Sequence, residues 1–131
     1  MSTRGNICVK VRKGDFDRVN DVVEKYGRDK VTEEAPYLYI YNHFDSFPED
    51  LGKELLNNYD SYTKALNLVL EGDCSYPDRP YSLREPYANT CPKTTDKFEN
   101  ALNHMYLYVY DTEWECYDSQ MNKLTIWTII F

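Results

Sequence analysis

The sequence predicts an α+β fold, a single domain over residues 1–131 in which a mostly antiparallel sheet carries helices packed mainly on one face. Three observations favour this fold class. Segments towards both ends of the chain alternate apolar and polar residues, as half-buried strands do, and segments between them repeat apolar residues at helical spacing. The chain contains no linker, repeat or low-complexity tract, and 131 residues with 42% hydrophobic content suffice to bury one core.

The first strand and the first helix are expected directly after one another. Residues 6–12 alternate, with three apolar side chains on one face, which predicts a half-buried strand. Residues 15–26 repeat their apolar positions at helical spacing and are followed by Gly27, where we expect the helix to end. The charged stretch 28–36 contains a proline and is expected to form a loop.

A second alternating strand, 37–43, leads into two further helices. Ser46 could cap the first of them, because its hydroxyl can accept a hydrogen bond from a free backbone N–H at the helix start. A proline also follows at an early helical position, where its missing N–H costs nothing. Asp60 or Ser61 could cap the next helix, which Gly72 should end.

The rest of the chain predicts a long loop followed by a meander. Four prolines in 73–94 argue against regular structure, although 81–84 could form a short edge strand, and Thr94 or Thr95 should open a short helix. Three strands should follow, at 105–110, 113–117 and 124–131. The last is apolar on both faces, which is typical of a strand covered on both sides or of a contact between subunits of a homo-oligomer.

Composition argues against several function classes. The net charge is −7, from 15 Lys plus Arg and 22 Asp plus Glu, whereas direct nucleic-acid binding needs a cationic face. No apolar run approaches the roughly 20 residues of a membrane span and the N-terminus does not resemble a signal peptide, so we expect a cytoplasmic protein with no membrane partner. Four cysteines without a Cys-x-x-Cys pair are expected to be reduced. With only two histidines, we expect no metal and no cofactor.

Tyrosine is the unusual component, with 13 residues in the chain. In two predicted strands it alternates with aliphatic residues, at Tyr37, Tyr39 and Tyr41 and at Tyr106, Tyr108 and Tyr110. If the aliphatic sides of both strands meet the helices, all six tyrosines share the opposite face of one sheet. Such a face could lie under the proline-rich loop, bind a protein or a second copy of the chain, or stack nucleic-acid bases.

The predicted turn beside these tyrosines is acidic. Asp111, Glu113 and Glu115 lie within 98–122, a stretch without Lys or Arg. This patch could bind a partner, imitate phosphate groups in a basic groove, or only keep the protein soluble. We expect the partner-binding surface to consist of these three carboxylates and the six alternating tyrosines.

The segment 41–53 has the most chemical character, because it follows a strand and opens a helix. His43 and Asp45 could be acid–base partners, metal ligands or, with free amides at the helix start, a site for a small anionic or nucleotide ligand. The same two side chains could instead satisfy backbone groups of a tight turn. The chain has no nucleophile motif and no phosphate-binding glycine loop, so we expect a protein that is not an enzyme.

Two segments resemble one protein family. The opening Met-Ser-Thr-Arg-Gly-Asn-Ile-Cys-Val-Lys and the segment Tyr-Asn-His-Phe-Asp-Ser-Phe-Pro-Glu-Asp-Leu-Gly-Lys are similar to small uncharacterised phage and prophage proteins, and the likeness extends to 70–73 and the tyrosine-rich hairpin. Those proteins typically begin Met-Gly/Ser-Thr-Arg-Ser-Asn-Ile and carry His-Trp-Asp-Gly-Tyr-Pro-Glu-Gly-Val-Gly before a helix. This chain has Phe44 for the Trp, and Ser46 and Asp50 for two of the glycines, so its turn should not need a positive φ at those two positions.

The resemblance implies a viral accessory protein that acts in the bacterial host cytoplasm. Our first hypothesis is that the protein binds and inhibits a host protein, such as a defence component in the manner of an anti-CRISPR factor, through its acidic, tyrosine-rich surface. The alternative is a binder or hydrolase of a small anionic or nucleotide ligand at the turn of His43 and Asp45. A virion or assembly component, joined through the apolar C-terminal strand, is a third hypothesis.

Overall fold

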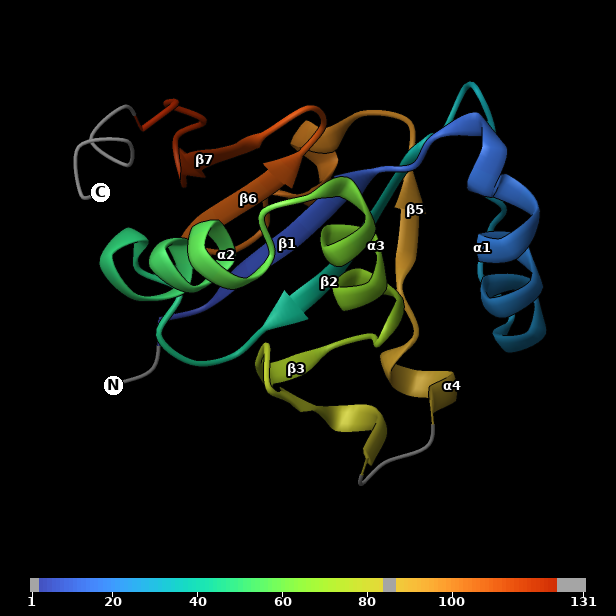
Figure 1. The fold of residues 1–131 in the computed structure, drawn as a ribbon, viewed down its shortest axis with the longest axis horizontal. Coiled ribbons are helices and arrows are strands. Elements are labelled where there is room, and N and C mark those ends of the chain that lie inside the picture. Colours follow the sequence, from blue (N-terminus) through green and yellow to red (C-terminus); the bar gives the residue numbers. More distant parts are fainter. Residues whose placement is uncertain (1–2, 84–86, 125–131) are drawn as a thin grey trace.

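One mixed, mostly antiparallel sheet organises the molecule (Figure 1), for which a computed structural model describes residues 3–83 and 87–124. Its strands are β1 (Gly5–Lys10), β2 (Tyr37–Asn42), β3 (Cys74–Tyr76), β4 (Arg79–Pro80), β5 (Lys93–Thr95), β6 (Tyr106–Tyr110) and β7 (Trp114–Asp118). The strand order is β4–β3–β2–β1–β6–β7, and β5 also pairs with β2. The β1–β6 and β2–β3 pairs are parallel and the other pairs are antiparallel. The predicted α+β class is therefore confirmed.

Helices cover mainly one face of this sheet. They are α1 (Phe16–Val23), α2 (Lys53–Asn58), α3 (Tyr62–Leu70) and the short α4 (Tyr87–Thr90), with a π-helical turn, η3 (Pro48–Gly52), directly before α2. Figure 1 shows α2 and α3 in front of the central strands and α1 beside the sheet. None of the helices within 3–83 and 87–124 is long and apolar enough to cross a membrane.

The predicted helix ends are confirmed at three positions. The hydroxyl of Ser61 accepts the backbone N–H of Lys64 at 3.3 Å and so caps α3. After the two helices that start at Phe16 and Tyr62, the chain turns at Gly27 (φ 77°) and Gly72 (φ 89°), a left-handed conformation that glycine adopts without a steric penalty.

The central strand β1 is buried on both faces, not half-buried as its alternation predicts. On the helix-covered face, Ile7 and Val9 belong to the main core together with aliphatic residues of β2, α2 and α3. On the opposite face, Cys8 packs with Leu107 and Ala101 in a second, smaller core. The 3-10 turn η5 (Phe98–Ala101) supplies part of that second core, so the short helical segment expected after Thr95 covers the face that the sequence assigned to solvent.

The two tyrosine triplets lie on opposite faces of the sheet, so the prediction that they share one face is wrong. Cys8 pairs with Tyr39 on β2, whereas Ile7 pairs with Tyr108 on β6. Cross-strand partners point to the same face and consecutive residues of one strand point to opposite faces. Tyr106, Tyr108 and Tyr110 therefore face the helices, and Tyr37, Tyr39 and Tyr41 face away from them. Alternation within a strand cannot reveal this, because the phase between strands is set by their register.

Three local expectations also differ from the structure, and a fourth falls outside the described residues. Ser46 does not cap η3: its hydroxyl accepts a hydrogen bond from Asn42 Nδ2 at 2.9 Å instead. The proline-rich stretch contains β3 and β4, and the expected edge strand at its centre is a 3-10 turn over Tyr81–Leu83. Residues 93–95, where a helix was expected to open, form β5. The C-terminal strand expected over 124–131, and the homo-oligomer contact assigned to it, fall outside the described residues, which end at 124.

Candidate functional site

A cavity of about 310 Å³ lies beside β2 on the sheet face turned away from α2 and α3. We call it the β2 pocket, and it is lined by Arg4, Asn6, Tyr39, Ile40, Tyr41, Asp73, Lys93, Asn103 and His104. Strand register explains how these distant residues meet. Asn6 on β1 is the cross-strand partner of Tyr41, and Lys93 on β5 is the partner of Tyr39, so the four side chains stand on one face.

Asn6 fixes the floor of the β2 pocket. Its side chain is 2% exposed, and its Nδ2 donates to the carbonyl of Ala101 at 2.7 Å and to Oδ1 of Asn103 at 2.6 Å. These bonds hold the segment before β6 against β1. The Oδ1 atom of Asn6 accepts no hydrogen bond from any described residue. A buried acceptor of this kind gains free energy when a donor reaches it.

The rings of Tyr41 and His104 form one wall of the β2 pocket. The ring of Tyr41 lies 4.8 Å from that of His104, centroid to centroid, and its hydroxyl shares a 2.6 Å hydrogen bond with Nδ1 of His43. Burial lowers the pKa of His104, and the positive charges of Arg4 and Lys93 lower it further. His104 is therefore held in its neutral form by an environment that is already cationic.

Asp73 closes the edge of the sheet next to the pocket. Two short strands share the outer edge of β2. The pairing with β5 ends at Tyr39 and the pairing with β3 is at Asn42, so the N–H of Tyr41 between them has no strand partner. Oδ1 of Asp73 accepts that N–H at 2.9 Å. Burial raises the pKa of the Asp73 carboxyl, and the hydrogen bond from Tyr41 together with the charges of Lys93 and Arg28 lowers it in part. Its Oδ2 accepts no hydrogen bond from the described residues and can accept one from a ligand.

The cations of the β2 pocket are unpaired within the described part of the chain. Neither Arg4 nor Lys93 has a carboxylate oxygen there within 4.0 Å, whereas surface lysines such as Lys30 and Lys64 are paired at 3.1 Å. In a chain of net charge −7, two unpaired cations at one cavity favour an anionic occupant.

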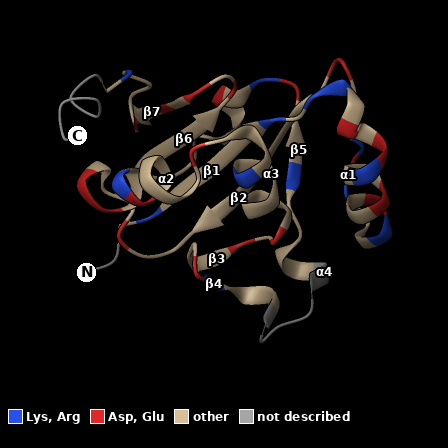
Figure 2. Ribbon diagram, in the orientation of Figure 1, with Lys and Arg blue, Asp and Glu red and all other residues tan. Residues whose placement is uncertain are grey.

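The face that carries the pocket is electrostatically polarised along β2. At its start, burial raises the pKa of Tyr37, and the carboxylates of Asp111, Glu99 and Glu115 raise it further. At its end, burial raises the pKa of Tyr41, but the charge of Arg4 opposes that shift. Figure 2 shows red segments at the β6–β7 turn and along β7 and a blue segment on β5. Near the start of β2 cations are present as well, with Lys10 Nζ 5.9 Å from the centroid of the Tyr37 ring.

Only part of the predicted tyrosine surface is exposed in the structure. Tyr108 is 0% exposed, and its hydroxyl donates to the carbonyl of Ser46 at 2.6 Å. Tyr110 is also buried, and Tyr106 packs against the same core. Tyr108 and Tyr110 therefore cannot present a binding surface, whereas Tyr106 is only half-buried, with its ring 6.0 Å from that of the exposed Phe47. Tyr37, Tyr39 and Tyr41 are half-buried on the other face, with Tyr39 and Tyr41 in the β2 pocket.

The acidic turn is present as predicted by sequence position. Asp111 and Glu113 are exposed between β6 and β7. Glu115 is partly engaged, because its carboxylate accepts the Tyr117 hydroxyl at 2.6 Å and lies 3.4 Å from Lys123 Nζ. The predicted acidic residues and part of the predicted tyrosines therefore remain at the surface. Tyr37 lies near the acidic turn, whereas Tyr39 and Tyr41 lie in the β2 pocket.

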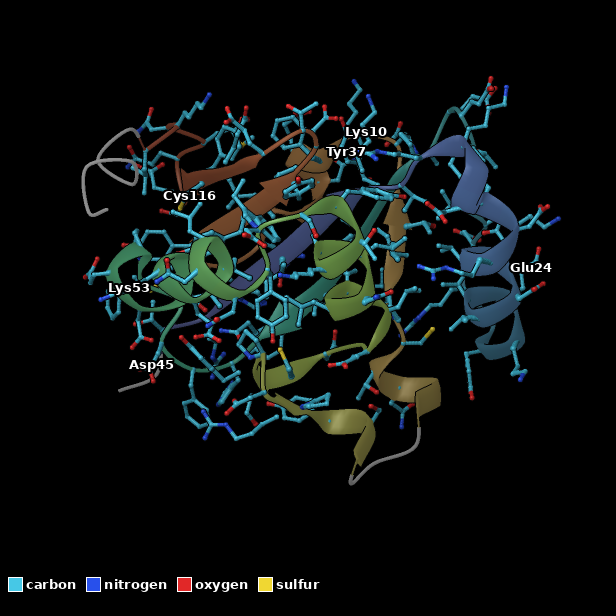
Figure 3. All side chains as sticks on the ribbon, viewed as in Figure 1. Lys10, Glu24, Tyr37, Asp45, Lys53 and Cys116 are labelled. Carbon is cyan, nitrogen blue, oxygen red and sulfur yellow. The ribbon has the colours of Figure 1, made fainter. Side chains whose placement is uncertain are left out.

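Within the described residues, the side chains of His43 and Asp45 do not hydrogen-bond each other, and neither bonds a backbone group of the turn. The ring of His43 contacts Tyr41 and lies 4.5 Å from the ring of Phe44. Asp45 is exposed with φ 56°, and its carbonyl accepts the N–H of Leu51 at 3.1 Å. Figure 3 shows Asp45 far from Tyr37, at the opposite end of β2. The left-handed residue of this turn is Asp45 itself, and neither Ser46 nor Asp50 has a positive φ, which agrees with the loss of both glycines.

The residues that frame the cavity were not singled out from the sequence. Arg4 and Asp73 lie in segments that carry the resemblance, but no binding role was expected for them, and Lys93 and His104 belong to no motif; the four come from four separate segments. Only the alternation of Tyr39 and Tyr41 pointed towards this face. Pairing of β5 with β2 brings Lys93 to the pocket, and this pairing was hidden because 93–95 carries no apolar alternation.

The four cysteines are buried free thiols, and the described residues contain no group of three or more metal-ligating side chains. Comparisons with known proteins found no matching family model, no matching curated protein and no matching solved structure.

Proposed function

We propose that this protein binds a small anionic ligand with a planar group, such as a nucleotide, in the β2 pocket. The observation that carries this proposal is the pair of unpaired cations, Arg4 and Lys93, at a cavity of about 310 Å³. Ligand sites typically occupy about 300–1,000 Å³ and combine apolar or aromatic walls with a few convergent polar groups. This proposal moves the anion site expected at His43 and Asp45 to the neighbouring pocket.

Each group in the pocket has a role in such binding. Arg4 and Lys93 neutralise the anion, and the rings of Tyr41 and His104 offer faces against which a planar group can stack. His43 does not line the pocket, but its hydrogen bond to the Tyr41 hydroxyl fixes the position of that ring. The free oxygen of Asp73 accepts an N–H or O–H of the ligand. The proposal includes binding only and no chemical step.

Isothermal titration with adenosine monophosphate and with inorganic phosphate tests this proposal. Arg4→Gln and Lys93→Gln should each weaken binding by about tenfold, the usual effect of removing one charge-assisted contact. Lys53→Gln is the matched control, because Lys53 is exposed at the start of α2, away from the pocket (Figure 3). Equal binding by all three variants, or no binding by the wild type, would contradict the proposal.

A second candidate function rests on the acidic turn. Asp111 and Glu113 are exposed, and the half-buried Tyr37 lies within range of the charge of Asp111. Tyrosine is enriched at the hot spots of protein interfaces, and carboxylates around such a residue can select a partner with a cationic surface. The resemblance to phage proteins supports a viral accessory protein that inhibits a host protein in the bacterial cytoplasm through this surface.

Affinity capture from a bacterial lysate tests the second candidate. A specific partner should be retained by the wild type and lost after Glu113→Lys combined with Asp111→Lys, because both charges at the turn are then reversed. Arg4→Gln should leave this capture unchanged. Recovery of the same proteins with the charge-reversed variant would rule the surface out.

A further inference from the structure

The β2 pocket continues into a second hollow of about 260 Å³. Tyr39 and Lys93 line both hollows, and they are cross-strand partners, so together they form the ridge between them. The second hollow is completed by Arg28 and Thr94 on its far side. The two spaces therefore form one groove with a cation at each end, Arg4 and Arg28, and a third, Lys93, in the middle.

The backbone places Arg28 for this purpose. After α1 the chain reverses at Gly27 (φ 77°), and the N–H of Arg28 donates to the carbonyl of Val23 at 3.0 Å. Its Nε is buried and has no hydrogen-bond partner among the described residues. Burial raises the pKa of the nearby Cys91 thiol, and the charge of Arg28 and a hydrogen bond from it lower that pKa in part. One side of the guanidinium is thus anchored, whereas the Nε donor is unused.

Two carboxylates also face the groove. Asp73 lines the first hollow and Asp29 the second, against the three cations. An occupant must therefore combine negative groups for the cations with hydrogen-bond donors for the carboxylates. Phosphate groups supply the first, and the amino groups of bases or the hydroxyl groups of sugars supply the second.

The geometry points to a dinucleotide as the ligand: two nucleotide units, one in each hollow, with the Tyr39–Lys93 ridge between them. This inference rests on the proposed function, because it takes the β2 pocket as the first of the two subsites. A single nucleotide fills one hollow and leaves the other cation without an anion. Joining two units makes the second contact intramolecular, which raises affinity by about a hundredfold or more without any new type of contact.

The test compares adenosine monophosphate with the linear dinucleotide pApA, which has two phosphate groups, by isothermal titration against the wild-type chain. The dinucleotide should bind at least about a hundredfold more tightly, with one molecule bound per chain. Arg28→Gln should remove most of this advantage and leave the affinity for adenosine monophosphate within about twofold. Lys25→Gln is the matched control, since Lys25 is an exposed cation on the same turn and does not line the groove.

The outcomes separate this inference from the proposed function. If adenosine monophosphate binds in an Arg4-dependent way but pApA binds no more tightly, the inference is overturned and the proposed function stands. If neither compound binds, both fail. The wild-type comparison needs no substitution, so it decides the matter even if Arg28→Gln does not fold.

Discussion

The contact between Gly5 and Ser46 offers the sharpest test of the fold, because it joins the start of β1 to the turn after β2. A Cβ atom placed on Gly5 would lie 2.9 Å from Cβ of Ser46, 3.0 Å from its Oγ and 3.0 Å from the carbonyl oxygen of Tyr106. Carbon atoms in ordinary contact are about 3.5–4.0 Å apart. Gly5→Ala therefore forces β1 away from its neighbours and should destabilise the protein by about 1–3 kcal/mol.

The same geometry predicts that Ser46→Gly compensates. It removes two of the three close contacts, and only the one with the Tyr106 carbonyl remains. By itself Ser46→Gly should destabilise by about 1 kcal/mol, because Asn42 Nδ2 then loses the acceptor it has at 2.9 Å. In the double variant the two effects should be coupled by about 1–2 kcal/mol in the stabilising direction. The phage-protein pattern has Ser at position 5 and Gly at position 46, the reverse arrangement of the same pair.

Urea denaturation followed by far-ultraviolet circular dichroism measures all four corners of this double-mutant cycle. The control is Gly14→Ala, because a Cβ atom on Gly14 has nothing within 4 Å, and it should change the free energy of unfolding by less than about 0.5 kcal/mol. Additivity of the two single changes within about 0.5 kcal/mol would refute the contact. A destabilisation by Gly14→Ala as large as that by Gly5→Ala would show that loss of glycine, and not crowding, is the cause.

Three further predictions concern stability. Tyr108→Phe should destabilise the protein by about 1–3 kcal/mol in urea denaturation, because the carbonyl of Ser46 loses its 2.6 Å hydrogen bond. Tyr37→Phe should change the free energy of unfolding by less than about 0.5 kcal/mol. Equal effects of the two substitutions would contradict the assigned faces. Ser61→Ala should lower stability by about 1 kcal/mol through loss of the α3 cap, and an unchanged unfolding midpoint would contradict it. Because burial and nearby cations lower the pKa of His104, the native state binds its proton less readily than the unfolded chain, so stability should fall as pH drops below about 6.5; His104→Gln should reduce this slope, and an identical slope would exclude His104 as its source.

Much of the fold could be predicted from local patterns. Alternation located β1, β2, β6 and β7, and glycines marked the ends of the helical segments at Gly27 and Gly72. These features depend on residues close in the sequence. The prediction failed where a distant partner decides the outcome. Cys8 was assigned to solvent, yet η5, some ninety residues later, covers it.

The candidate site shows the same limit more strongly. Arg4, Asp73 and Lys93 meet at one cavity only because β5 and β3 share the outer edge of β2 and leave a gap that Asp73 fills. Neither β5 nor β3 has more than three residues, and both lie in a proline-rich stretch. Strands this short carry too little periodicity to be recognised. The tyrosines of β2 were correctly assigned to one strand face, but their surroundings depend on that pairing.

The opposite orientation of the two tyrosine triplets divides the mutational tolerance of the chain. On β6, Tyr108 and Tyr110 are buried and the Tyr108 hydroxyl bonds the Ser46 carbonyl, so smaller residues leave cavities at both positions and phenylalanine is the mildest change at Tyr108. On β2 the tyrosines border water and the pocket, and their replacement changes what the protein can hold more than whether it folds. The two tyrosine triplets have the same alternating sequence pattern but tolerate different substitutions. A saturation scan that scores folding and binding independently should sort them into two classes, although composition alone counts them as one.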